Sequence, residues 1–64
     1  MNEIVNEWLI QLINETIEEA KATIANERMW QNGAADDESI NNHEFNIQCN
    51  ELYIEKLEEI KNNL

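Results

Sequence analysis

The apolar residues in the first half of the chain recur in alternating steps of three and four positions. This spacing keeps them on one side of an α-helix, whereas a half-buried strand would alternate with period two. It predicts a helix over about residues 2–31, with a seam of apolar side chains along one side. The seam consists of Ile10, Ile13, Ile17, Ala20 and Ile24.

A second seam with helical spacing follows in the other half of the chain and predicts a helix over about residues 37–62. The main seam residues are Ile40, Ile47, Ile54 and Leu57, with Tyr53, Ile60 and Leu64 beside them. The polar side of this helix carries a ridge that suits solvent. The ridge consists of Glu44, Gln48, Glu51, Glu55, Glu59 and Asn62.

The segment between the two helices, residues 32–36, contains the single glycine of a chain without proline. We expect Gly33 to adopt a left-handed conformation just past the end of the first helix. Asp36 or Asp37 is expected to cap the start of the second helix. A turn this short makes the two helices antiparallel neighbours. The sequence therefore predicts an all-α fold, with residues 1–64 forming one antiparallel two-helix hairpin.

The size of the chain favours association with another chain, because 64 residues rarely bury a core that is stable alone. A single cysteine, Cys49, excludes an internal disulfide, and with a single histidine, His43, a closed Cys/His zinc site is excluded too. Both helices also carry apolar residues beside their seams. These flanking residues are Val5, Trp8, Leu12, Thr16, Thr23 and Trp30, followed by Phe45, Cys49 and Leu52.

One partner helix cannot cover an apolar surface that wide. We therefore expect two hairpins to pair into a homodimeric four-helix bundle, with docking of a different protein on these flanks as the alternative. Trp8 and Trp30 belong to the flank of the first helix. Tryptophan is enriched at the energetic centres of interfaces, so both residues are candidates for partner binding, with packing inside the dimer as the other interpretation.

The charge balance narrows the choice of partner. The chain has a formal net charge of −10, from 14 acidic and 4 basic residues. Binding a nucleic-acid backbone requires clustered lysine and arginine, and an anionic membrane surface would repel this chain. The expected partners are neutral or basic protein surfaces, including those that normally hold nucleic acid. Glu44, Glu51, Glu55 and Glu59 would face such a partner, although solubility alone also accounts for acidic helix faces.

The expected location is the cytoplasm of a bacterial cell. No basic leader with an apolar run begins the sequence, and no stretch approaches the ~20 apolar residues of a membrane span. An unpaired cysteine suits a reducing compartment. The abundance of Asn, Ile, Glu and Lys is typical of an AT-rich genome.

Candidate catalytic and metal-binding residues are few. His43 and Asn50 occupy seam positions seven residues apart, and we interpret them as a polar layer that fixes register, rather than as a catalytic pair. Cys49 has acidic neighbours, which do not activate a thiol. No Glu-x-x-His pair of the kind used by di-metal bundles is present. We expect neither a metal nor another cofactor, and no enzymatic activity.

Two resemblances concern function. The stretch Cys49-Asn50-Glu51-Leu52-Tyr53 resembles the Ser-Gln-Glu-Leu-Asp signature of the helical-hairpin phosphatases that act on sporulation response regulators. Glu51 and Leu52 match, but Tyr53 replaces the aspartate that the signature requires, so the resemblance does not extend to phosphatase activity.

The layout of the whole chain, and the junction Glu27-Arg28-Met29-Trp30…Gly33-Ala34…Asp37-Glu38-Ser39, resemble short acidic helical-hairpin proteins of bacteriophages and prophages of low-GC bacteria. That resemblance implies an accessory protein that inhibits a host protein, such as a component of an antiviral defence system. We therefore expect a non-enzymatic inhibitor, acting in one version by mimicry of nucleic acid. The alternatives are a structural assembly module and, more remotely, a phosphatase-like hairpin.

Overall fold

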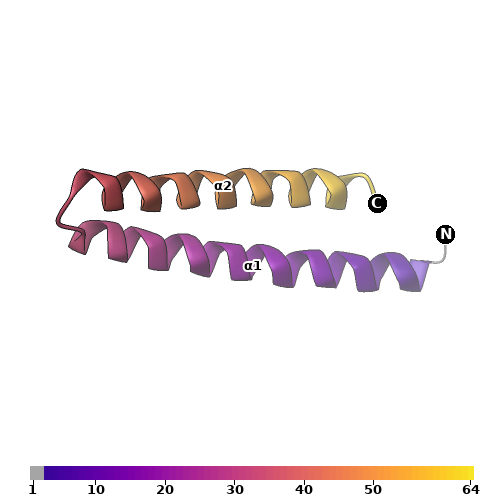
Figure 1. Cartoon of the computed structure of the whole chain (residues 1–64). Helices are drawn as coiled ribbons and strands as arrows, with labels where there is room; N and C mark the ends of the chain where they lie inside the picture. The colour runs from indigo at the N-terminus through magenta and orange to yellow at the C-terminus, as the bar shows by residue number, and fades with distance from the viewer. Residues whose placement is uncertain (1–2) are drawn as a thin grey trace.

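The computed structural model describes residues 3–64, which form two α-helices and no strand. Helix α1 spans Glu3–Gly33 and helix α2 spans Asp37–Asn62, with 31 and 26 residues respectively. The helices lie side by side and antiparallel, joined by a short turn, as the sequence predicts (Figure 1). The hairpin is 51 Å long, and the longer α1 extends past the end of α2 at its open end (Figure 1). Within residues 3–64, neither helix is long and apolar enough to span a membrane.

The end of α1 differs from the prediction. The helix continues through Gly33, so the connection contains residues 34–36 instead of 32–36. Gly33 does not have a positive φ, and the expected left-handed conformation is wrong. The Ala34 N–H donates to the Gln31 carbonyl oxygen at 3.2 Å, a bond that tightens the last turn. This right-handed ending satisfies a terminal carbonyl group without a left-handed residue. At the other end, residue 2 of the predicted helix lies outside the described residues.

The start of α2 confirms one of the two capping candidates. Asp36 has an extended backbone, and its Oδ1 accepts the Ser39 N–H at 2.7 Å. Asp37 and Glu38 follow in the first turn, and Lys61 lies in the last turn. These charges complement the partial charges of the helix ends. The N-cap at Asp36 fixes the start of α2, and the chain reverses direction within residues 34–36.

The core is a single row of side chains between the helices. Five apolar residues of the described chain are buried, four from α1 and one from α2: Ile13, Ile17, Ala20, Ile24 and Ile47. The other predicted seam residues are only half-buried, namely Ile10, Ile40, Ile54 and Leu57. A core this small leaves both broad faces of the hairpin open.

Candidate interaction surfaces

The two broad faces of the hairpin differ in chemistry. In an antiparallel pair of right-handed helices, residues that precede a seam residue by one position lie on the same face in both helices, since each helix advances about 100° per residue. Leu9 and Thr16 precede seam residues of α1, and Tyr53 precedes Ile54 of α2. Residues that follow a seam residue, such as Glu18 and Glu55, lie on the opposite face. Helix geometry thus places most of the apolar residues near the open end on one face, which Glu19 and Lys56 share. It places Glu18, Glu51 and Glu55 on the other face, together with Lys21 and Arg28.

We call the first of these surfaces the apolar face. It occupies the part of the hairpin near its open end. Leu12, Tyr53 and Ile60 are 59%, 49% and 53% exposed, which is high for side chains of this size. The members from α1 are Val5, Leu9, Leu12 and Thr16, and those from the α2 side are Tyr53, Leu57, Ile60 and Leu64.

The same face becomes polar near the turn, where four side chains form a cluster. The Nδ1 of His43 lies 2.6 Å from Oε2 of Glu27, and the Asn46 amide donates to the same oxygen at 3.5 Å. A carboxylate can only accept hydrogen bonds, so the imidazole Nδ1–H donates. The rings of Trp30 and His43 are tilted at 50°, with centroids 6.1 Å apart. We call Glu27, Trp30, His43 and Asn46 the polar cluster.

Glu27 is the functional candidate that the sequence analysis missed. It is 9% exposed, and it is the one charged residue among the buried residues of the described chain. Its position continues the seam of α1, because Glu27 follows Ile24 by three residues and precedes Gln31 by four. An acidic residue at a seam position was therefore the sequence signal that would have identified Glu27.

The predicted polar layer is only partly formed. His43 and Asn50 are both half-buried, but the Asn50 amide donates to the Asn46 carbonyl oxygen of its own helix at 2.9 Å. His43 instead pairs across the hairpin with Glu27. The half-buried His43 thus makes its cross-helix polar contact with Glu27 and not with Asn50.

The opposite surface, which we call the acidic face, carries most of the predicted ridge, whereas Glu59 lies seven residues after Leu52, on the outward side of α2. The four glutamates of the ridge are exposed. Glu44 accepts a hydrogen bond from Gln31 at 3.1 Å, and Glu59 pairs with Lys56 at 3.3 Å. Exposed pairs such as the second contribute little to stability. The four glutamates of the ridge, Glu44, Glu51, Glu55 and Glu59, are therefore available to a partner.

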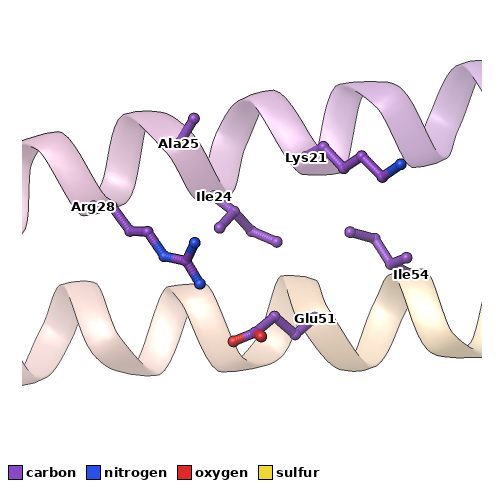
Figure 2. Close-up of a pocket in the computed structure, with 6 residues that line it drawn as sticks. All are labelled: Lys21, Ile24, Ala25, Arg28, Glu51 and Ile54. Atoms are coloured by element: carbon purple, nitrogen blue, oxygen red, sulfur yellow. The ribbon is translucent and has the colours of Figure 1, made fainter.

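A groove of about 440 Å³ lies between the helices on the acidic face. Lys21, Ile24, Ala25 and Arg28 line it from α1, and Glu51 and Ile54 line it from α2 (Figure 2). The Arg28 guanidinium points toward α2 in Figure 2, and Lys21 is held by Glu18 at 3.5 Å. Two of the four basic residues of the chain thus border this groove, and the acidic ridge extends along α2 beyond it.

The predicted partner-binding tryptophans lie far apart on α1. Trp8 is 66% exposed and Trp30 is 54% exposed. Trp30 belongs to the polar cluster near the turn, whereas Trp8 lies near the open end. A further apolar strip, formed by Phe45, Cys49 and Leu52, lies on the side of α2 that points away from α1, and all three residues are exposed.

The described residues were also compared with the requirements of a metal site, and the chain with known proteins. Among residues 3–64, no three His, Cys, Asp or Glu side chains are gathered so that they would hold a metal ion. No protein-family model, curated protein or solved structure matches the chain. The two faces of the hairpin are therefore the features that bear on its function.

Proposed function

We propose that this protein is a non-enzymatic interaction protein that forms a homodimer through its apolar face and binds a basic surface of another protein through its acidic face. By occupying that surface it inhibits a host protein, as an accessory protein of the bacteriophage type would do in the bacterial cytoplasm. The observation that carries the proposal is the separation of apolar and acidic residues onto opposite faces of one thin hairpin.

The first part of the proposal, dimerisation, is supported by surface area. The chain exposes 4961 Å², whereas a compact protein of 7.5 kDa exposes about 4,250 Å². The excess reflects the elongated, open shape of the hairpin, which leaves surface for an interface of standard size, in which each partner contributes ~800 Å². A second hairpin on the apolar face would remove Leu12, Tyr53 and Ile60 from water and double the number of helices around the core.

The second part, binding through the acidic face, is supported by the geometry of the ridge. Glu51, Glu55 and Glu59 follow one another at intervals of four residues, which places successive carboxylates about 6 Å apart along the helix. A row of exposed carboxylates with this regularity complements lysine and arginine side chains on a protein surface that normally binds nucleic acid. Mimicry of nucleic acid is therefore the form of inhibition that the ridge favours.

The dimer is tested with two leucines whose exposure is almost the same. Leu12 lies on the apolar face and is 59% exposed, while Leu52 lies on the outward side of α2 and is 60% exposed. Leu12→Glu should convert the dimer to a monomer in sedimentation equilibrium, because it places a charge in the interface. Leu52→Glu adds the same charge and should leave the dimer intact. Equal effects of both variants, or a monomeric parent protein, would contradict the proposed interface.

The partner is sought by capture from a host lysate, and its binding is then measured with the purified target. Neutralising the ridge in a Glu51→Gln, Glu55→Gln and Glu59→Gln variant should weaken binding at least tenfold. The control carries the same change in net charge on α1, as Glu3→Gln, Glu7→Gln and Glu15→Gln, and should bind almost normally. Equal losses would mean that total charge matters and the ridge does not.

The dependence of binding on ionic strength distinguishes binding through the acidic ridge from binding through apolar side chains. Between 0.05 M and 0.5 M salt the Debye length falls from ~14 Å to ~4 Å, so contacts between exposed charges weaken. Binding through the ridge should therefore decline over this range. If the affinity does not change with salt but is lost in Trp8→Ala or Trp30→Ala, the partner binds by apolar docking and not by mimicry of nucleic acid. A dimer that binds no target would favour the structural assembly module.

A further inference from the structure

The apolar face has a chemical direction along the hairpin. Near the open end it consists mainly of aliphatic and aromatic side chains, among them Leu9, Leu12 and Ile60, with the exposed Lys56 between Tyr53 and Ile60. Near the turn it consists of the polar cluster, in which the Glu27 carboxylate is bound by His43. A second copy that covers this face must therefore match an apolar half and a polar half.

The hydrogen bonds between the helices show which residues lie at the same level. Near the turn, Gln31 donates to the Ile40 carbonyl oxygen at 3.3 Å and Glu27 pairs with His43. Toward the open end, Lys61 donates to Asn14 at 3.0 Å. Leu12 of α1 thus lies level with the last turns of α2, where Leu57 and Ile60 are found, whereas Glu27 lies level with His43 and Asn46.

A second copy can be related to the first by two kinds of twofold axis in the plane of the interface. An axis parallel to the helices places both turns at the same end of the bundle, with α1 of each copy against α2 of the other. An axis perpendicular to the helices places the turns at opposite ends, with α1 against α1 and α2 against α2. Neighbouring helices are antiparallel in both arrangements, so the helix dipoles do not distinguish them.

Chemical matching does distinguish them. With the perpendicular axis, the Leu9 and Leu12 region of one copy faces the Glu27 region of the other, and Leu57 faces the region of His43. A buried carboxylate would then lie against aliphatic side chains, without polar partners from the second copy. With the parallel axis, Leu12 meets Leu57 and Ile60 of the second copy, and Glu27 meets His43 and Asn46 of the second copy. The two Glu27 residues then lie on diagonal helices.

We propose that the two hairpins associate with both turns at the same end, about a twofold axis parallel to the helices, and that the polar clusters of the two copies form a shared layer that fixes this orientation. The inference rests on the proposed homodimer. A single polar layer in an otherwise apolar interface specifies register and orientation in coiled coils by the same principle.

Distances between spin labels test the orientation. Cys49 is exposed, so a Cys49→Ser background is expected to fold normally, and Ala35→Cys then places one label in the turn of each copy. Neighbouring helices pack 8–10 Å apart, so turns at the same end should give a label-to-label distance below about 30 Å. Turns at opposite ends of a hairpin 51 Å long should give about 45 Å or more.

A mixed sample provides the reciprocal control. Hairpins labelled at Ala35→Cys are combined with hairpins labelled at Asn62→Cys, which lies at the open end. The proposed orientation predicts a long distance between unlike labels, and the orientation with the turns at opposite ends predicts a short one. Absence of any dipolar coupling in all samples would show a monomer, which overturns the homodimer itself. A long turn-to-turn distance with normal coupling would overturn the orientation alone.

The role of the polar layer is tested separately with the Glu27→Leu and His43→Leu double variant. Without the Glu27–His43 pair neither orientation places a buried carboxylate against aliphatic side chains, so the label at Ala35→Cys should give two distances instead of one. Retention of a single short distance in the double variant would show that the polar layer does not determine the orientation.

Discussion

The pair formed by Glu27 and His43 is the least expected feature of individual residues in this protein. Glu27 occupies a seam position that aliphatic residues fill elsewhere in α1, and its side chain is 11% exposed. Burying a carboxylate is unfavourable unless partners replace its water. His43 and Asn46 supply those partners from the other helix. Each of these residues therefore matters for stability mainly through the penalty of leaving Glu27 unpaired.

Substitution of His43 alone should therefore destabilise the protein more than substitution of Glu27 and His43 together. His43→Ala is expected to lower the free energy of unfolding by about 1–3 kcal/mol, because Glu27 keeps only the long contact with Asn46. The Glu27→Leu and His43→Leu double variant should be at least as stable as the parent protein, since apolar packing replaces a desolvated pair. Urea unfolding of both variants measures this order, and a double variant weaker than His43→Ala would contradict it.

Gly33 offers a stabilising substitution at the end of α1. Its φ is not positive, and a Cβ added there would meet no atom within 4 Å. Gly33→Ala should therefore raise the free energy of unfolding by about 0.5–1 kcal/mol, because alanine restricts the unfolded chain and suits a helix. Thermal melts should show a higher Tm. A lower Tm would indicate that the glycine adopts the left-handed conformation in solution.

At the scale of the helices, the sequence was sufficient to predict those features that depend on residues close together in the chain. The steps of three and four residues predicted both helices, and the Asp36-Asp37 pair after the turn predicted the cap of α2 to within one residue; the structure has it at Asp36. The ending of α1 at Gly33 was not predictable, since it depends on the path by which the chain enters α2. Predicting the contact between Glu27 and His43 would also have required the register of the two helices, and neither sequence pattern gives that register.

The assignment of helix faces can be tested by two substitutions of opposite kind. Ile17 is 3% exposed at the centre of the core, so Ile17→Asp should unfold the protein by burying an unpaired charge. Glu55 is exposed on the ridge, and Glu55→Gln should change stability by about 0.5 kcal/mol or less. Circular dichroism melts of both variants provide the measurement. Similar losses for the two would show that the faces are wrongly assigned.

At the scale of the whole molecule, the hairpin is a thin layer with one row of core side chains and a net charge of −10. Association of two such layers brings together chains that repel each other. The Tm should therefore rise with protein concentration, as expected when folding is coupled to association. Added salt should tighten the dimer, because it screens the repulsion, while it weakens a complex formed through the ridge. Sedimentation in 0.05 M and 0.5 M salt measures the first effect, and a dimer weakened by salt would contradict it.

The unequal lengths of the helices have a consequence for local opening. Helix α1 extends past α2 at the open end of the hairpin, so its first turns pack against α2 less than the segment that holds Ile13, Ile17 and Ile24 does. Backbone amides exchange their hydrogens with solvent through local opening, whose free energy follows the packing of each segment. Exchange should be fastest over residues 3–9 and slowest over residues 13–27, as amide-resolved NMR would show. The hairpin then frays from its open end, while the part joined by the turn stays closed.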